Sequence, residues 1–428
     1  MGSIRSGWMC VLFLTVALTE CATTQTIRYD QVIEFYRQKL NADPLDFISA
    51  ISLGETYTSR ARTTGSSGDY VEAEKAYRLS LKRMPTHNID AKVGLAASLA
   101  SQHRFKEADA IVKDAMSESP ETPSLWAIAG DVAFDLGDYE RAAGLYKLYA
   151  NQKPGLASWG RLARIEMFRG NFEAAGKLWE RSCDLPAGSD PEPSAWAWVM
   201  RGSLSLNSGD FSKALSCYER ALNIMPDFAL ALEHKAEIKM LEEQFDEAIR
   251  LYHRAIFSSK DPGLQIFLGD AFKRAGHPDS AATAWKLGES QYRARVREGD
   301  IGYLRPLALY YLDHGTQLQK ALELAKKDMK IRQDIGAYST LARAYLQSGR
   351  KEEALQTLKK APSMAENDPQ FCFQAGEIHA ANRDIAEAGR LYTRAIELCP
   401  AFDRIYNQDV TLKVSRLEKK ETSSNARR

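Results

Sequence analysis

Three stretches of the sequence repeat one eighteen-residue pattern: GDYVEAEKAYRLSLKRMP at 68–85, GDYERAAGLYKLYANQKP at 137–154 and GDFSKALSCYERALNIMP at 209–226. All three begin with Gly, Asp and an aromatic residue, and all three end in proline. Between these ends each keeps one alanine and, four residues later, one tyrosine. Residues four apart share a helix face, and proline cannot continue a helix. Each stretch therefore predicts one helix with a fixed contact face.

The conserved alanine of this pattern recurs ten times with nearly constant spacing. Its successive intervals are 35, 34, 33, 39, 34, 33, 40, 33 and 34 residues. A period near 34 is typical of a helical solenoid and not of a globular enzyme domain. The alanines are Ala73, Ala108, Ala142, Ala175, Ala214, Ala248, Ala281, Ala321, Ala354 and Ala388.

A second helix is predicted ahead of each alanine-bearing one. Large and small residues recur there at helical spacing, as in Trp126 followed by Ala129-Gly130, with the small residue marking a close helix contact. A glycine with a polar residue, such as Gly137-Asp138, then marks the turn between the two helices. Each unit is thus expected to be a helix hairpin.

At these residues the chain resembles the tetratricopeptide-repeat (TPR) proteins over about residues 45–400. The resemblance implies an all-α, right-handed superhelical solenoid of about ten hairpins whose first helices line a concave groove. In that family the groove holds a peptide or a partner helix. Array ends need capping, and we expect capping helices at about Tyr29–Leu40 within the segment 22–44, and at Phe402–Lys419 within a basic tail over 401–428.

Three units depart from the regular pattern. The first has a longer internal turn, ARTTGSSGDY, and a Pro/Gly/Ser-rich loop, LPAGSDPEPSAW, separates the fourth unit from the fifth. The third departure, ESQYRARVREGDIGYLRP, is charged and is expected to extend a helix between the seventh and eighth units. These insertions are either tolerated surface segments or partner contacts.

The first 21 residues have the layout of an export signal: one arginine, an apolar run over Met9–Thr19, then small residues. The run is too short to span a membrane. ALTEC resembles a bacterial lipobox and makes Cys21 a lipidation candidate, although Glu20 departs from that pattern. Cleavage after Ala17 or Thr19 would give an unlipidated protein, and Gly2 with Ser6 also fits N-myristoylation.

The cysteines and histidines indicate no metal site. There is no Cys-x-x-Cys and no paired Cys/His spacing. Cys372 and Cys399 lie at the two ends of one predicted hairpin, where antiparallel helices bring them together. They are expected to be either a disulfide in an exported protein or two buried free thiols.

No catalytic motif is recognisable, and the repeats take up nearly the whole chain. The sequence lacks a phosphate-binding GxxxxGK[ST], an HExxH and a GxSxG. The net charge of +1, from 57 basic and 56 acidic residues, argues against a nucleic-acid-binding protein. We therefore expect no enzyme, no cofactor and no metal.

Aligning the units by their alanines predicts which side chains face the groove. The mixture is apolar with both charge signs, which fits a protein segment, and it shows no Lys/Asn clamp for a terminal carboxylate. The predicted groove residues are Asp131, Phe134, Arg164, Met167, Trp196, Leu206, Glu237, Met240, Asp270, Lys273 and Arg343.

The sequence thus predicts a non-catalytic scaffold that binds a protein or peptide and organises a complex of the bacterial envelope. We expect it to be exported, either periplasmic or membrane-anchored through a lipidated N-terminus. The alternatives are a cytosolic or membrane-tethered adaptor, and an accessory subunit of polysaccharide or envelope synthesis.

Overall fold

The computed structural model describes residues 29–186, 188, 190–406 and 408–416, and its regular elements there are all helices. A helix over 29–42 comes first. The helices that follow are α2 (Phe47–Thr64), α3 (Ser67–Arg83), α4 (Ile89–Ser101), α5 (Phe105–Glu118), α6 (Pro123–Leu136), α7 (Tyr139–Gln152), α8 (Leu156–Phe168), α9 (Phe172–Cys183), α10 (Glu192–Asn207), α11 (Phe211–Ile224), α12 (Ala229–Leu241), α13 (Phe245–Ser258), α14 (Gly263–Arg274), α15 (Pro278–Arg297), η1 (Ile301–Tyr303), α16 (Leu304–Asp313), α17 (Leu318–Ile331), α18 (Ile335–Gln347), α19 (Lys351–Leu358), η2 (Ser363–Asn367), α20 (Pro369–Ala381), α21 (Ile385–Leu398) and α22 (Phe402–Ile405).

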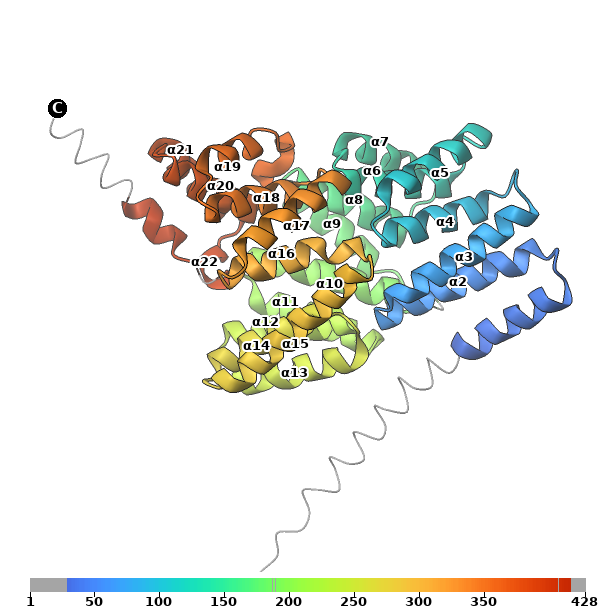
Figure 1. Cartoon of the computed structure of the whole chain (residues 1–428), viewed down its shortest axis with the longest axis horizontal. Helices are drawn as coiled ribbons and strands as arrows, with labels where there is room; N and C mark the ends of the chain where they lie inside the picture. Colours follow the sequence, from blue (N-terminus) through green and yellow to red (C-terminus); the bar gives the residue numbers. More distant parts are fainter. Residues whose placement is uncertain (1–28, 187, 189, 407, 417–428) are drawn as a thin grey trace, which may run out of the picture.

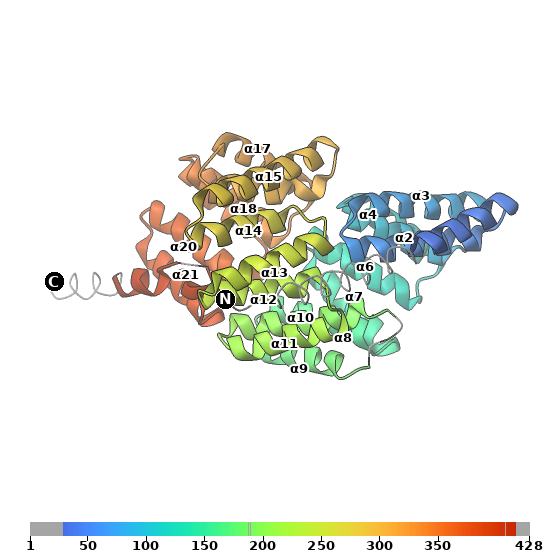
Figure 2. The ribbon, with the colours of Figure 1, turned by 90° about the horizontal axis from the view of Figure 1, so that it is seen from below.

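The helices form ten hairpins, from α2 with α3 to α20 with α21, and each helix packs mainly on its hairpin partner and on the next hairpin. We number these hairpins repeats 1 to 10. Figures 1 and 2 show them stacked into a superhelix. The predicted all-α solenoid is confirmed.

Packing inside each repeat follows one rule. All ten recurring alanines have no exposed surface. A ring of the second helix lies against a small residue of the first: a Cβ at Gly54 would lie 2.7 Å from the ring of Tyr77, and one at Gly376 would lie 2.6 Å from that of Tyr392. Burying such a ring contributes about 2–3 kcal/mol. The alanine and the glycine are therefore required by the close approach of the two helices.

The predicted departures have clear structural forms. The extra residues of repeat 1 prolong α2 to Thr64, and Gly65 ends it in the left-handed conformation with φ of +66°. The charged insertion between repeats 7 and 8 extends α15 to 20 residues, as expected. The loop between repeats 4 and 5 runs from Asp184 to Pro191, and its residues 187 and 189 lie outside the described part.

The two ends of the array differ from each other. The predicted N-terminal capping helix is confirmed over 29–42, where Ile33 and Leu40 are buried in the first apolar cluster. The prediction of one helix over Phe402–Lys419 is wrong. Helix α22 ends at Ile405, and a separate helix covers 410–416. Asp403 interrupts the helix because its carboxylate accepts from the backbone N–H groups of Val410 and Thr411, at 2.7 and 2.9 Å.

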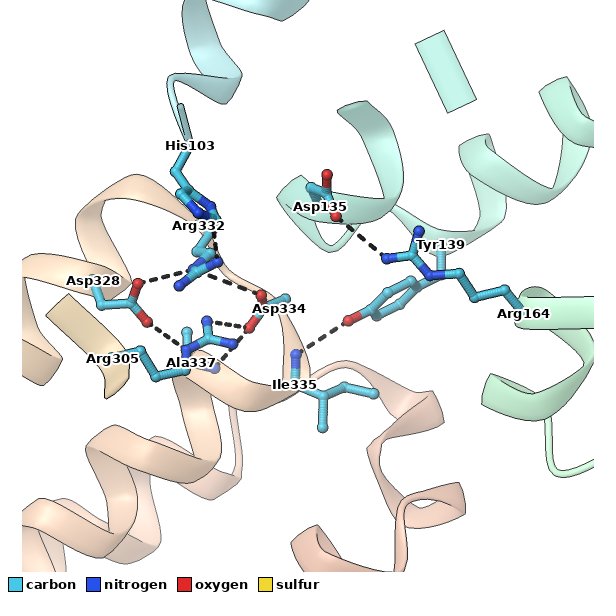
Figure 3. A network of polar contacts seen from close by, with 10 residues as sticks. All are labelled: His103, Asp135, Tyr139, Arg164, Arg305, Asp328, Arg332, Asp334, Ile335 and Ala337. Carbon is cyan, nitrogen blue, oxygen red and sulfur yellow. Dashed lines mark hydrogen bonds and ion pairs between the residues drawn. The ribbon is translucent and has the colours of Figure 1, made fainter. Parts of the chain in front are cut away.

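The superhelix also closes on itself after one turn. Each hairpin turn of the first repeats meets a loop about five repeats further along the chain. The turn after α2 meets the loop after α13, where the Lys260 amide donates to the Thr64 carbonyl at 3.4 Å. Figure 3 shows a second such meeting, where Ile335, after α17, lies against Tyr139, after α6. The two turns of the superhelix are therefore in direct contact.

Gly137 is one of the points where the turns touch. Its φ is +89°, and a Cβ there would collide with the Gln333 carbonyl of the other turn. The same loop continues in Ile335, whose amide donates to the Tyr139 hydroxyl at 3.1 Å. Ile335 and Tyr139 also share one apolar cluster, so this contact is polar and apolar at once.

Candidate functional site

A cavity of about 660 Å³ opens on the concave side of repeats 2–5, and we call it the inner groove. Its floor is formed by first helices, α4, α6, α8 and α10, as the superhelix geometry requires. The lining residues are Arg62, Ala97, Ala100, Ser101, His103, Phe105, Ile128, Asp131, Asp135, Leu156, Ala157, Gly160, Arg161, Arg164, Glu192, Pro193, Trp196 and Arg332.

One side of the inner groove carries a fully formed ion pair. Arg161 donates to both oxygens of Asp131, at 2.8 and 2.6 Å, and the Tyr146 hydroxyl donates to the same carboxylate at 2.9 Å. Burial raises the pKa of Tyr146, and the charge of Asp131 adds to that shift. Two donors already bind Asp131, so we assign this pair to fixing α6 against α8.

A second ion pair in the groove is much looser. The Arg164 guanidinium lies 3.5 Å from Asp135 and 3.8 Å from the ring centre of Phe134. Burial raises the pKa of Asp135 to about 6, and the nearby Arg164 offsets only part of that effect. Asp135 and Arg164 are thus incompletely paired groups that can contact a bound molecule.

Trp196 provides the aromatic surface of the groove. It is half-buried and meets the buried Trp179 edge to face, with ring centres 5.2 Å apart. On the rim beside it, Arg62 of repeat 1 lies 3.7 Å from Glu192 and 3.2 Å from Asp190. Burial raises the pKa of Glu192, with Arg62 opposing the shift. The inserted loop before α10 therefore reaches across one rim of the groove to repeat 1.

Of the predicted groove residues, Asp131, Arg164 and Trp196 line the inner groove. Met167 does not line it and packs instead against the apolar cluster that contains Trp179. Phe134, Leu206 and Met240 do not line the inner groove either, and they are buried at 4%, 4% and 8% exposure, so their prediction as groove residues is wrong. The physical reason is rotational register, since a position one place round the helix turns from the groove into the packing between hairpins.

The remaining predicted residues lie on later repeats, outside the inner groove. Glu237 is 3.1 Å from His234. Asp270 accepts from the Trp285 indole at 3.0 Å, and the Lys273 ammonium lies 5.7 Å from that ring centre. Arg343 pairs with Asp313 at 2.7 Å. Each of these side chains therefore contacts a neighbour within or next to its own repeat.

Several groove residues were absent from the prediction. Asp135 is one helical turn after Asp131, and Arg161 is one turn before Arg164, so helical spacing could have found both. Arg62, His103 and Arg332 had no such signal, because they reach the groove from other repeats or from the opposite turn of the superhelix.

For Cys372 and Cys399 the sequence left a disulfide and two buried free thiols open, and the structure has the free thiols. Cys372 and Cys399 are both buried with free thiols, and Cys372 Sγ lies 3.3 Å from the Glu366 carbonyl. Burial raises the pKa of Cys372 to about 12 and that of Cys399 to about 11. Cys21 and the export signal lie outside the described residues, and their roles stay predictions.

Neither a metal cluster nor a membrane-spanning helix is present among the described residues. In that part of the chain no three His, Cys, Asp or Glu side chains are placed to hold a metal ion. None of the helices there combines the length and the apolar composition that crossing a bilayer requires.

Comparisons with known proteins bear on the family. Tetratricopeptide-repeat models match residues 93–157, 195–228 and 315–371. No curated protein is significantly similar to this chain in sequence.

Among solved structures, yeast Tom70 is similar with 12% identity, 96% coverage of both chains and a TM-score of 0.42. PilW, a widely conserved type IV pilus biogenesis factor, is 19% identical over 50% of this chain and 95% of its own, with a TM-score of 0.40. PilF of Pseudomonas aeruginosa is 14% identical over 48% of this chain and 92% of its own, also at 0.40. At these values the three structures carry no argument about what this chain binds.

The three family matches fall on repeats 2–3, 5 and 8–9, and the same hairpin packing runs through the repeats between them. The chain therefore carries tetratricopeptide repeats at these positions, within an array of ten helix hairpins between Phe47 and Leu398.

Proposed function

We propose that this protein is a non-catalytic scaffold that binds a segment of a partner protein in the inner groove. TPR arrays are typically protein-interaction scaffolds, and this general role is supported by the family matches. The observation that carries the location is the cavity of about 660 Å³ in the middle of repeats 2–5.

The chemistry of the groove favours a polypeptide over a purely charged ligand. Leu156 and Trp196 supply apolar surface, and Arg164 and Asp135 supply one incompletely paired charge of each sign. Apolar and aromatic anchors with a few polar groups are typical of sites that bind peptide segments. A main chain with mixed side chains can satisfy both kinds of surface.

Site-specific photo-cross-linking tests the proposal. A benzophenone amino acid replaces Ala157, which is exposed and lines the groove, in the full-length protein expressed in its own cell. A matched probe replaces Lys177, which is 71% exposed on the convex helix α9. We expect a discrete polypeptide adduct at position 157 that is absent at 177.

A pair of tryptophan variants provides the control. Trp196→Ala removes groove surface and should abolish the adduct at 157. Trp198→Ala removes a ring of the same helix that lies near Arg201 and Arg220 outside the groove, and should leave the adduct unchanged. The absence of any polypeptide adduct at 157, or equal adducts at 157 and 177, would contradict the proposed site.

We further propose that the scaffold acts in an envelope-associated complex, exported through residues 1–21. This part of the proposal rests on the sequence of those residues alone. Cell fractionation tests it: full-length, uncleaved protein found entirely in the cytosol would contradict export, and a mass corresponding to a lipidated Cys21 would support membrane anchoring.

A further inference from the structure

The loop between repeats 8 and 9 carries a compact network of ion pairs (Figure 3). Asp328 is 1% exposed and accepts from Arg305 and Arg332, each at 2.8 Å. Asp334 accepts from Arg305 at 2.7 Å and caps α18 by accepting from the Ala337 amide, also at 2.7 Å. Two arginines and two aspartates thus tie this loop to α16, α17 and α18.

The same network connects to the opposite turn of the superhelix. The Arg332 guanidinium donates to Nδ1 of His103 at 3.3 Å, and the Ile335 amide donates to the Tyr139 hydroxyl at 3.1 Å. We call His103, Tyr139, Arg305, Asp328, Arg332 and Asp334 the inter-turn clasp. The clasp joins segments that are far apart in the chain: Tyr139 and Ile335 are separated by 196 positions, and His103 and Arg332 by 229.

The protonation state of His103 is compatible with its contact to Arg332. Burial and, to a smaller extent, the charge of Arg332 together lower the pKa of His103 to about 4. A neutral imidazole has a free lone pair that can accept from Arg332, whereas a protonated one would repel the guanidinium.

The clasp is also part of the inner groove. His103 and Arg332 both line the cavity, whereas Tyr139 and Asp334 do not. Any separation of the two superhelical turns at the clasp would therefore remove one wall of the groove. At the clasp the two turns meet through these polar contacts and through the apolar cluster that Tyr139 shares with Ile335, whereas packing along the repeats is continuous. Local opening of the contact between the turns therefore leaves every hairpin folded.

We propose that the inter-turn clasp is a gate of the inner groove: its opening admits a partner segment, and its closing encloses the segment. The gate rests on the proposed function for its biological purpose. The opening itself is a property of the free protein and can be measured without any partner.

Two probes follow the gate: one measures contact between the superhelical turns, and the other measures access to the inner groove. The Lys106 ammonium donates to the backbone carbonyl of Lys330 across the turns at 3.2 Å, so the two lysines are neighbours in the closed form, and a short amine-to-amine cross-linker should join them there. The Ala100→Cys variant places a thiol in the groove wall one turn before His103, and a bulky maleimide then reports groove access. Mass spectrometry separates position 100 from the native cysteines.

The opening variant is Tyr139→Phe with Asp334→Asn. It removes the hydroxyl that binds Ile335 and one charge of the network, changes no groove-lining residue, and keeps an amide oxygen that can cap α18. We expect a clear loss of the Lys106–Lys330 link and labelling at position 100 that is about fivefold faster for each hydrogen bond lost.

The matched control carries the same two changes elsewhere. Tyr392→Phe removes a hydroxyl that binds Glu377, and Asp210→Asn changes the cap of α11. The control should label at the wild-type rate. The cross-linked protein gives the reverse test. Protein already linked through Lys106 and Lys330 is held closed and should label more slowly at position 100.

Each outcome of these experiments supports or overturns the proposed gate. Unchanged linking and labelling in the opening variant, or lost linking with unchanged labelling, overturns it. Equal effects in the control would also overturn it by showing general loosening. The proposed function fails independently, by the absence of a polypeptide adduct at position 157 in every variant.

Discussion

Packing within the repeats and contact between the superhelical turns follow different rules. Inside every repeat an alanine with no exposed surface lies near the turn, and in most repeats a ring lies against a small residue. Between the turns each contact is made of different chemistry, such as the Tyr139 hydroxyl with a backbone amide and Asn367 with the Phe168 carbonyl. The first kind holds each of the ten hairpins together, and the second kind joins the two turns of the superhelix.

The difference predicts where mutations should be most harmful. A lost ring inside a repeat leaves a cavity in a continuous core, whereas a lost contact between turns releases two surfaces to water. We therefore expect the largest loss of stability inside a repeat and smaller losses between the turns, in the groove and on the convex face.

Replacing Trp179 by alanine should lower the free energy of unfolding by about 3–5 kcal/mol, because its side chain is 1% exposed and fills repeat 4. Hydrogen exchange over α8 and α9, together with urea unfolding, measures the effect where it occurs. The control is Trp159→Ala in α8 of the same repeat, whose half-exposed ring lies 4.3 Å from the Arg181 guanidinium. Equal losses in the two variants would contradict the rule for packing within repeats.

Replacing Arg332 by alanine should cost about 2–3 kcal/mol, since it leaves the buried Asp328 with Arg305 as its remaining partner. Hydrogen exchange should accelerate at Ile335 and around Tyr139, while α2 and α3 stay protected. Lys330→Ala, two residues away and exposed, is the control and should change little. Loss of protection spread evenly over all ten repeats would show that the turns and the repeats unfold as one unit.

These two predictions also separate what the sequence could and could not show. The ten alanines, the glycine turns and the terminal prolines recur in the sequence, so the hairpins and their stacking could be predicted. Each such signal is local, because the residues that touch lie within about one repeat of each other.

The closure of the superhelix has no such signal. His103 and Arg332 lie 229 residues apart, and nothing in either segment indicates the other. The same limit applies to the groove: Asp131, Arg164 and Trp196 could be predicted from their repeats. Phe134, Leu206 and Met240 could not be placed, because a rotation of one helical position separates groove from core.

A smaller effect is expected at Asp135 in the inner groove, and it depends on pH. The folded pKa of about 6 lies above the unfolded value of about 3.9, so the folded state binds more protons between them. Stability should therefore fall as the pH rises from 4 to 6, and the penalty should persist at pH 7.

The variant Asp135→Asn should remove that dependence. At pH 7 it should stabilise the protein by about 1 kcal/mol, a figure reduced for a side chain that is 32% exposed. Thermal unfolding at pH 4 and pH 7 measures both states, and at pH 4 the variant and the wild type should be alike. A variant less stable at pH 7 would show that Arg164 compensates the carboxylate fully.

The smallest effect is expected on the convex face, at the pair of Glu173 and Lys177 in α9. Their charged atoms are 2.7 Å apart, but the side chains are 85% and 71% exposed. Water and salt screen such a pair, and holding two long side chains together costs entropy. Lys177→Ala should therefore leave the melting temperature unchanged at low and at high salt. A salt-dependent drop would mean that side chains outside both kinds of contact help to hold the array, and the contrast between repeats and turns would then be incomplete.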